Sequence, residues 1–238
     1  MDYFYAPPER IDDRCVVIDG DELSHLVHVM RKKAGDRIMV VDGNGCAYDV
    51  LLETVTKRSA RGVIRSMYRA YHEPASQVTL AVGILKNPSR FDFLVEKVTE
   101  IGVIGIIPLR TERTIPSRAK TDRWQKLALA AMKQCGRSRL PRVKELTSLD
   151  DLLRTRETYR RRFIAHVEAN HPTSAGESLS AVPDSTLILV GPEGGFSEDE
   201  IARCVGAGFE PVVLGDRRLR TETAAIALAT LTILEGGR

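Results

Sequence analysis

Hydrophobic and polar residues alternate along the first third of the chain in the manner of short, half-buried β-strands. Asp42-Gly43-Asn44-Gly45 predicts a hairpin between two of these runs, because Asn and Gly tolerate the positive φ angles of tight turns. One helix is expected over residues 21–31, with Leu26, Val29 and Met30 on one face. The predicted strands, all rich in Val and Ile, are 15–19, 37–42, 46–56 and 62–67.

The pattern changes at residues 70–76, a polar stretch with a proline that we interpret as a domain boundary. Beyond it, apolar runs alternate with segments of helical periodicity, which predicts a mostly parallel sheet covered by helices on both faces. The expected domains are therefore residues 1–70, a β-rich module, and 76–238, an α/β domain. The predicted strands of the second domain are 78–85, 104–109, 163–167, 186–190 and 212–214, and its predicted helices are 88–102, 123–134, 198–207 and 223–234.

Composition favours a cytoplasmic protein with no membrane or metal partner. Of the 238 residues, 43% are hydrophobic, yet no apolar stretch approaches the roughly 20 residues that span a bilayer. The N-terminus lacks a basic region followed by an apolar one. The four cysteines form no Cys-x-x-Cys pair, which argues against a zinc site or a disulfide framework.

Basic residues are clustered, although the net charge is only +3. Such clusters suit a polyanion, but most charge runs are simply solvated faces, so both interpretations stay open. The clusters lie at residues 31–33, 57–69, 137–142 and 160–162.

A glycine-rich turn over residues 191–196 follows the strand predicted at 186–190. Its glycines allow the backbone to approach a ligand closely, and Ser197 with Glu200 forms a capping box that begins the next helix. A purely structural turn is an equally good interpretation of this turn alone. The motif is neither Gly-x-Gly-x-x-Gly nor a P-loop, so it disfavours a nicotinamide dinucleotide or a nucleoside triphosphate.

A second turn, at residues 214–224, places Arg218, Arg220 and Glu222 at the start of an alanine-rich helix. Arginines oppose the positive end of a helix, so a negative or hydrogen-bonding group should lie near them. That group is either Glu222 or Asp216 within the chain, or a carbonyl or phosphate of a substrate.

Five motifs occur in the same order as in the bacterial 16S rRNA (uracil-N3)-methyltransferases, and the chain resembles this family from about residue 3 to 235. This is the small-subunit methyltransferase E family of the knotted SPOUT superfamily. Arg218 departs from the family, which more often has an aliphatic residue there. The motifs are Gly191 to Gly195, Leu214 to Ala224, Val98 to Val103, Gln134 to Arg139, and His25-x-x-His28-Val29-Met30-Arg31 with Gly35-Asp36.

The resemblance implies a fold, a cofactor and partners. It implies an N-terminal PUA-like β-barrel that binds RNA, and a C-terminal α/β domain with a trefoil knot. It further implies S-adenosylmethionine as cofactor, 16S rRNA of the small ribosomal subunit as substrate, and a homodimer.

The resemblance also implies site residues. Loops at 165–167, 191–195 and 214–221 would hold the cofactor, Arg220 would stabilise negative charge on the uracil carbonyls, and Glu222 would orient Arg220. The expected cofactor ligands are His166, Gly191, Pro192, Glu193, Gly194, Gly195, Leu214, Gly215, Leu219, Arg220 and Thr221. The expected RNA contacts are His25, Arg31, Lys32, Lys33, Lys86, Arg90, Arg137 and Arg139.

Cys135, His25 and His28 allow other assignments. Cys135 suggests a thiolate nucleophile, but transfer to N3 needs no covalent intermediate, so we interpret it as a packing residue. His25 and His28 lack neighbouring ligands, which favours surface or RNA-facing roles over a metal. Two other functions stay open: a non-catalytic RNA-binding or ribosome-assembly factor, and a methyltransferase acting on another RNA position such as the ribose 2′-hydroxyl.

Overall fold

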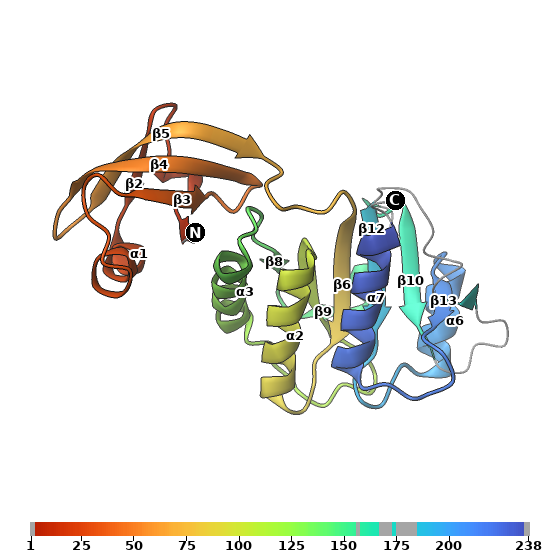
Figure 1. Cartoon of the computed structure of the whole chain (residues 1–238). Coiled ribbons are helices and arrows are strands. Elements are labelled where there is room, and N and C mark those ends of the chain that lie inside the picture. The colour runs from red at the N-terminus through yellow and green to blue at the C-terminus, as the bar shows by residue number, and fades with distance from the viewer. Residues whose placement is uncertain (1–2, 156–157, 167–172, 175–184, 236–238) are drawn as a thin grey trace. The chain divides into compact units, whose positions relative to one another are not determined.

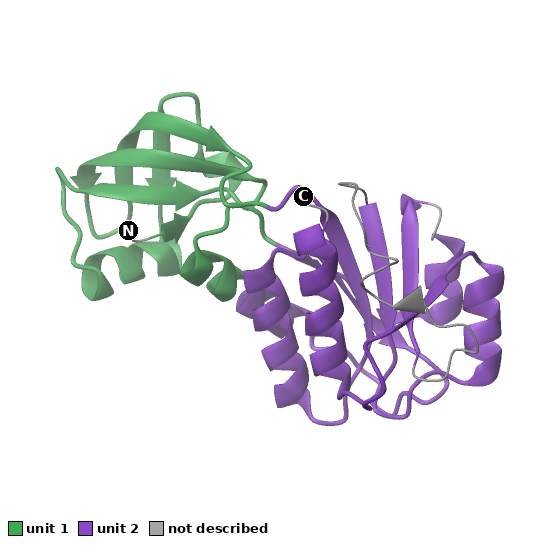
Figure 2. Cartoon of the chain, turned by 45° about the vertical axis from the view of Figure 1, so that its right-hand side comes forward, with its two compact units in different colours: residues 1–73, 129–140 green, residues 74–128, 141–238 purple. Residues whose placement is uncertain are grey.

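The computed structural model describes residues 3–155, 158–166, 173–174 and 185–235 (Figure 1). The chain divides into two compact units (Figure 2). Unit 1 comprises Met1–Glu73 together with Leu129–Leu140, and unit 2 comprises Pro74–Ala128 and Pro141–Arg238. The sequence did not predict that the segment 129–140 would belong with the N-terminal unit.

Unit 1 is built on a five-stranded sheet of order β1-β3-β4-β5-β2. β1 pairs with β3 in parallel, and the remaining pairings are antiparallel. The predicted hairpin between β3 and β4 is present, with Gly43 and Gly45 at φ values of 76° and 106°. The strands are β1 (Tyr3–Tyr5), β2 (Cys15–Ile18), β3 (Arg37–Val41), β4 (Cys46–Val55) and β5 (Ala60–Arg69), and a 3-10 turn η1 (Pro8–Arg10) lies between the first two.

The helix predicted at 21–31 is present, but it ends earlier and is not α-helical throughout. The structure has a short α-helix, α1 (Gly20–Ser24), followed by a π-helical turn, η2 (His25–Val29). The wider turn keeps Leu26 in the core but carries Val29 out of the expected apolar face, so that Val29 is 63% exposed. The element ends before Arg31, whose φ of 53° is left-handed.

Unit 2 contains an eight-stranded sheet of order β11-β13-β10-β12-β6-β7-β8, with β9 beside β7. All pairings among its described residues are parallel, as the alternating pattern predicts. The short strands β8, β9 and β11 were not predicted. The strands are β6 (Gln77–Gly83), β7 (Gly105–Arg110), β8 (Arg142–Val143), β9 (Thr147–Ser148), β10 (Arg161–Ala165), β11 (Thr173–Ser174), β12 (Ser185–Val190) and β13 (Glu210–Val213).

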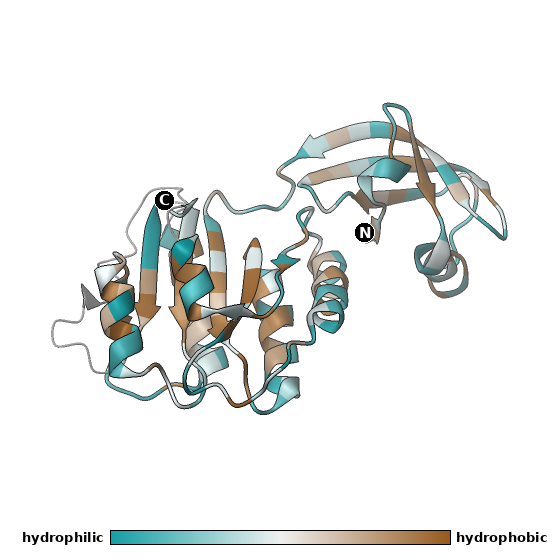
Figure 3. Ribbon diagram, turned by 180° about the vertical axis from the view of Figure 1, so that it is seen from behind, coloured by the Kyte–Doolittle hydropathy of each residue, from teal (hydrophilic) through white to brown (hydrophobic). Residues whose placement is uncertain are grey.

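Helices cover both faces of this sheet. Successive residues of β12 point to opposite faces, and Leu187 and Leu189 pack in one core with residues of α4 and α6. α7 packs against β6, β12 and α2. Figure 3 shows the central strands as mainly hydrophobic between helices that carry both hydrophilic and hydrophobic residues. The helices are α2 (Pro88–Ile101), α3 (Thr121–Cys135), α4 (Leu149–Arg154), α6 (Glu198–Gly206) and α7 (Thr221–Glu235).

The helix boundaries follow local chemistry. Asn87 caps α2 by accepting a hydrogen bond from the backbone N–H of Ser89, and Gly102, at φ 122°, ends it, both as predicted. The predicted capping box of Ser197 and Glu200 is present at the start of α6. In the described part of the chain, no helix is long and apolar enough to cross a membrane. The trefoil knot stays a prediction.

Candidate active site

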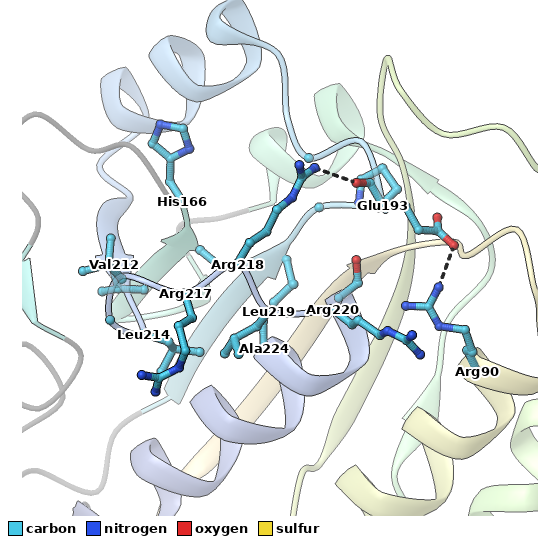
Figure 4. Close-up of a pocket in the computed structure, with 18 residues that line it drawn as sticks. Arg90, His166, Glu193, Val212, Leu214, Arg217, Arg218, Leu219, Arg220 and Ala224 are labelled. Atoms are coloured by element: carbon cyan, nitrogen blue, oxygen red, sulfur yellow. Dashed lines mark hydrogen bonds and ion pairs between the residues drawn. The ribbon is translucent and has the colours of Figure 1, made fainter.

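A cavity of about 530 Å³ opens in unit 2 at the carboxyl ends of β10, β12 and β13 (Figure 4). In parallel sheets this edge is the usual place for ligands, because the loops that follow the strands converge there. Three segments and one helix line the cavity. They are Ala165 and His166 at the end of β10, Val190 to Glu193 with Gly195 at the end of β12, Val212 to Gly215 with Arg217 to Thr221 and Ala224 around the β13–α7 connection, and Arg90 of α2.

The first glycine turn forms a wall of backbone. A Cβ added at Gly191 would lie 2.9 Å from the carbonyl carbon of Gly195, so only glycine fits there. Gly195, at φ 70°, has no atom within 4 Å of the position that a Cβ would take, so its backbone faces open space. Such a wall can meet a bulky ligand through main-chain groups.

Gly194, predicted as a cofactor ligand, is not among the residues that line this cavity. A Cβ at Gly194 would instead meet the side chain of Arg113 at 3.3 Å. The Arg113 guanidinium donates a hydrogen bond of 2.8 Å to the Gly194 carbonyl. Arg113, which the sequence did not indicate, therefore holds the turn on the side away from the cavity lining.

The second turn brings arginines to the cavity. Arg218 donates a 3.4 Å hydrogen bond to the Glu193 carbonyl, which links the two turns. Arg220 directs its guanidinium toward Arg90 (Figure 4). α7 begins at Thr221, two residues before the predicted start, so Glu222 lies in the first helical turn. A carboxylate there complements the positive end of the helix.

Glu222 pairs with Arg90, a partner that the sequence did not indicate, and its expected role in orienting Arg220 stays a prediction. Arg90 donates through Nε at 2.9 Å and through Nη2 at 2.5 Å to the two carboxylate oxygens of Glu222. Its Nη1 lies 3.3 Å from Oε1 of Glu193. Arg90 therefore belongs to the cavity wall, where two carboxylates fix its orientation.

The pKa values agree with this geometry. Burial acts to raise the pKa of Glu222, but hydrogen bonds from Arg90 and the backbone, with the charges of Arg90 and Arg220, lower it overall. The hydrogen bond to Glu222 raises the pKa of Arg90 despite partial burial. Both groups are therefore charged at neutral pH.

Arg137, predicted as an RNA contact, is buried in unit 1 and is only 3% exposed. Its Nη2 lies 2.7 Å from a carboxylate oxygen of Glu73. Glu73 also accepts hydrogen bonds from the backbone N–H groups of Ser138 and Arg139. The prediction is therefore corrected, because Arg137 ties the segment 129–140 to the end of the N-terminal region.

The other predicted RNA contacts differ in exposure. Arg139 and Lys32 are half-buried, and the remaining predicted contacts outside the cavity are exposed: His25, Arg31, Lys33 and Lys86. Their role in RNA binding stays a prediction. Val167, part of the expected cofactor loop, lies outside the described residues.

The Cys204 thiol is unsuited to act as a nucleophile, and Cys135 has a packing contact. Burial raises the pKa of Cys204 to about 12, which keeps this thiol protonated. The Cys135 thiol lies 3.5 Å from the carbonyl of Met132, an arrangement compatible with a packing role. Across the described ranges, no group of three or more His, Cys, Asp or Glu side chains is arranged to hold a metal.

Comparison with known proteins places this fold and cavity among the RNA methyltransferases. The family described as RNA methyltransferase domain matches residues 72–233, and the family described as RNA methyltransferase PUA domain matches residues 11–65. The predicted methyltransferase activity and PUA-like module are thus confirmed.

Individual relatives show which family of RNA methyltransferases the chain belongs to. A ribosomal RNA small subunit methyltransferase E of Synechocystis is 32% identical, over 95% of this chain and 76% of that protein. The protein of that name from Mycobacterium bovis is 30% identical, over 97% of this chain and 91% of its own. The chain belongs to the family of ribosomal RNA small subunit methyltransferases E, as its motifs predicted.

Solved structures of methyltransferases have the same fold as this chain. The small subunit methyltransferase E of Neisseria gonorrhoeae, bound to S-adenosylmethionine, has a TM-score of 0.84 and 31% identity, with 98% of each chain covered. A methyltransferase from Legionella pneumophila, also in complex with that cofactor, has a TM-score of 0.84 and 30% identity, with 99% of this chain and 98% of that one covered.

Proposed function

We propose that this protein transfers a methyl group from S-adenosylmethionine to N3 of a uracil in 16S rRNA of the small ribosomal subunit, and that it acts in the cytoplasm as a homodimer. The observation that carries the proposal is the cavity at the carboxyl ends of β10, β12 and β13, walled by two glycine turns and flanked by arginines. The family and its cofactor-bound members support the same reading.

The cavity suits S-adenosylmethionine in size and lining. Its volume of about 530 Å³ lies within the range of small-molecule sites. The polar parts of the cofactor can meet backbone donors and acceptors of Gly191 to Glu193, Gly195, Leu214, Gly215 and Arg217 to Thr221. Leu214, Leu219 and Val212 offer apolar contacts. When bound, the cofactor supplies a methyl group on a positively charged sulfur.

The arginines of the cavity have distinct parts in the proposed reaction. Uracil N3 becomes a good nucleophile only after it loses its proton, which leaves negative charge on the ring carbonyls. Arg220, which lines the cavity, is suited to donate to one of these carbonyls and stabilise that charge. Arg90, oriented by Glu222 and Glu193, adds a second fixed positive charge beside it.

RNA recognition belongs in part to other residues of the chain. N3 of uracil normally pairs with another base, so the target nucleotide must be unpaired or extruded. Phosphate contacts that position the RNA can come from exposed basic residues of both units. These are His25, Arg31 and Lys33 in unit 1 and Lys86 in unit 2. Half-buried Lys32 and Arg139 are proposed as additional contacts.

The homodimer is supported by the composition of α7. This helix is apolar around most of its circumference, and Leu234 is 61% exposed. A helix of this kind normally buries all its sides. A second copy of the chain would cover the outer side, on which Ile226, Ala227 and Leu231 are only partly buried.

Transfer of labelled methyl groups tests the proposal. Purified protein, methyl-tritiated S-adenosylmethionine and small subunits from a strain lacking the enzyme should yield labelled 16S rRNA. The matched control is Arg220→Ala, which keeps the glycine turns and should bind cofactor but transfer little label. Cofactor binding without any transfer by the wild-type protein would favour a non-catalytic RNA-binding factor and contradict the proposal.

A further inference from the structure

One face of the unit 1 sheet carries an exposed aromatic side chain beside arginine. Tyr68 of β5 is 43% exposed. It pairs with Ala47 of β4, which pairs with Val41 of β3, so these three side chains share one face. Val41 and Ala47 pack there with Met132 of α3, while Tyr68 extends the same face into solvent. This face is opposite the core that α1 and η2 cover.

Neighbouring aromatic rings hold this surface in a fixed arrangement. Tyr71 lies 5.6 Å from Tyr68 between ring centroids and stacks on His72 at 3.9 Å. The Tyr71 hydroxyl lies 3.3 Å from that of Tyr3, and Nδ1 of His72 lies 3.1 Å from the carbonyl oxygen of Gly136. Rings held in this way lose little conformational freedom when a further flat group stacks on them.

The arrangement also contains local strain. Ala70 and His72 have φ values of 49° and 55°, in the left-handed region that residues with a Cβ rarely adopt. Strain of this kind persists where the surrounding contacts impose it, often at functional positions. Here it turns the chain so that Tyr71 and His72 line up beside Tyr68.

Positive charge flanks the aromatic surface. Arg37 lies on the same face and its Nε donates a 3.2 Å hydrogen bond to the buried carboxylate of Asp49. That bond, the charge of Asp49 and the nearby Tyr68 hydroxyl raise the pKa of Arg37. Arg65, on the same strand as Tyr68, is exposed, whereas Arg69 is the residue after Tyr68 and points to the opposite face.

The edge of β5 adds a second feature. β2 pairs with β5 only from Ala60 to Val63. The strand continues to Arg69, and within the described residues its outer edge has no strand partner after Val63. Arginines along an open edge disfavour pairing with another protein strand and attract a polyanion.

We infer that Tyr68 and the adjoining Tyr71–His72 stack form a platform for an unpaired base of single-stranded RNA, with Arg37 and Arg65 contacting its phosphates. Aromatic rings next to a basic groove are the usual means of holding single strands, since every base presents a flat face. The inference rests on the proposed function and deepens it, because it assigns to unit 1 a second RNA surface, separate from the residues of α1 and η2.

Binding of oligouridine to the full chain tests the platform without requiring catalysis. Tyr68→Ala should weaken binding by about 5- to 150-fold, the range expected for loss of one stacked base. Tyr68→Phe, which keeps the ring, should bind within about 2-fold of wild type. The matched control is Met67→Ala, because Met67 is the next residue of β5, points to the opposite face and is similarly exposed at 47%. This control should leave affinity unchanged.

A fluorescence measurement distinguishes stacking from loss of fold. In Tyr68→Trp, oligouridine should quench the new emission, whereas the buried Trp124, 1% exposed, should not respond in wild type.

With small subunits as substrate, Tyr68→Ala should raise KM and leave kcat unchanged. A folded Tyr68→Ala variant with wild-type affinity and KM would overturn the inference even if methyl transfer is observed. A change in oligomeric state alone would assign the face to a protein partner and overturn it too. Loss of methyl transfer with the Tyr68 effect intact would count against the proposed function only.

Discussion

Gly191→Ala should weaken cofactor binding through displacement of the first turn. The added Cβ would lie 2.9 Å from the carbonyl carbon of Gly195, 3.0 Å from its Cα and 3.1 Å from the backbone nitrogen of Phe196. Ordinary contacts begin near 3.4 Å, so the turn must move by about 0.5 Å. Because the obstructing atoms are backbone, no side-chain rotation relieves the contact.

The magnitude follows from the cost of overpacking. Such contacts cost about 1–3 kcal/mol when the surroundings do not rearrange. If the turn relieves the strain by leaving its cofactor-binding position, it must return to that position when the cofactor binds. The free energy of binding then becomes less favourable by the same amount, and Kd for S-adenosylmethionine rises by about 5- to 150-fold. Calorimetric titration of the full chain measures this change directly.

Gly194→Ala is the matched control in the same turn. Its Cβ would meet only the flexible side chain of Arg113 at 3.3 Å, so affinity should change by less than about 3-fold. Thermal unfolding confirms that both variants are folded. If folded Gly191→Ala binds cofactor as tightly as Gly194→Ala does, the turn is not a wall of the cofactor site.

Further predictions concern the charged groups. Arg220→Ala should slow single-turnover methyl transfer by about 10²-fold at saturating cofactor, with the Kd for S-adenosylmethionine unchanged. Arg220→Lys should restore little of this rate. An unchanged rate for Arg220→Ala would remove Arg220 from the mechanism. Glu222→Gln leaves Arg90 with Glu193 as its carboxylate partner and should lower the free energy of unfolding by about 2 kcal/mol in urea titration. Glu100→Gln, in a partly exposed pair with Lys97, should cost under about 0.5 kcal/mol. Since folding lowers the pKa of Glu222 below 4.5, its contribution is present above that pH and is lost as the pH falls through the lower, folded value. The stability difference between wild type and Glu222→Gln should therefore shrink in acid, and a pH-independent difference would contradict the pairing.

Much of the fold could be predicted because local signals coincide with it. The capping box at Ser197, the cap at Asn87 and the glycine that ends α2 specify helix boundaries whatever their surroundings. Continuous apolar runs such as β12 mark strands buried on both faces. Two-residue strands such as β8 and β9 carry too few residues for any periodicity.

The partners of charged residues could not be predicted in the same way. Glu222 and Arg90 are 132 positions apart, and their contact depends on α7 packing against α2. Sequence proximity instead suggested Arg220. Likewise, Arg137 looked like an exposed member of a basic cluster, and only the burial of Glu73 beside it revealed a structural pair. The side of a glycine turn that faces the ligand also follows from tertiary contacts, as Arg113 at Gly194 illustrates.

Nucleoside mass spectrometry of 16S rRNA shows whether the protein methylates uracil N3. RNA from a strain lacking the enzyme is compared with RNA from the same strain expressing either the wild-type protein or Arg220→Ala. We expect one 3-methyluridine that is absent from the deletion strain, restored by wild type and not restored by the variant. Identical nucleoside profiles in all strains, or a methyl group restored on a ribose 2′-hydroxyl, would contradict it.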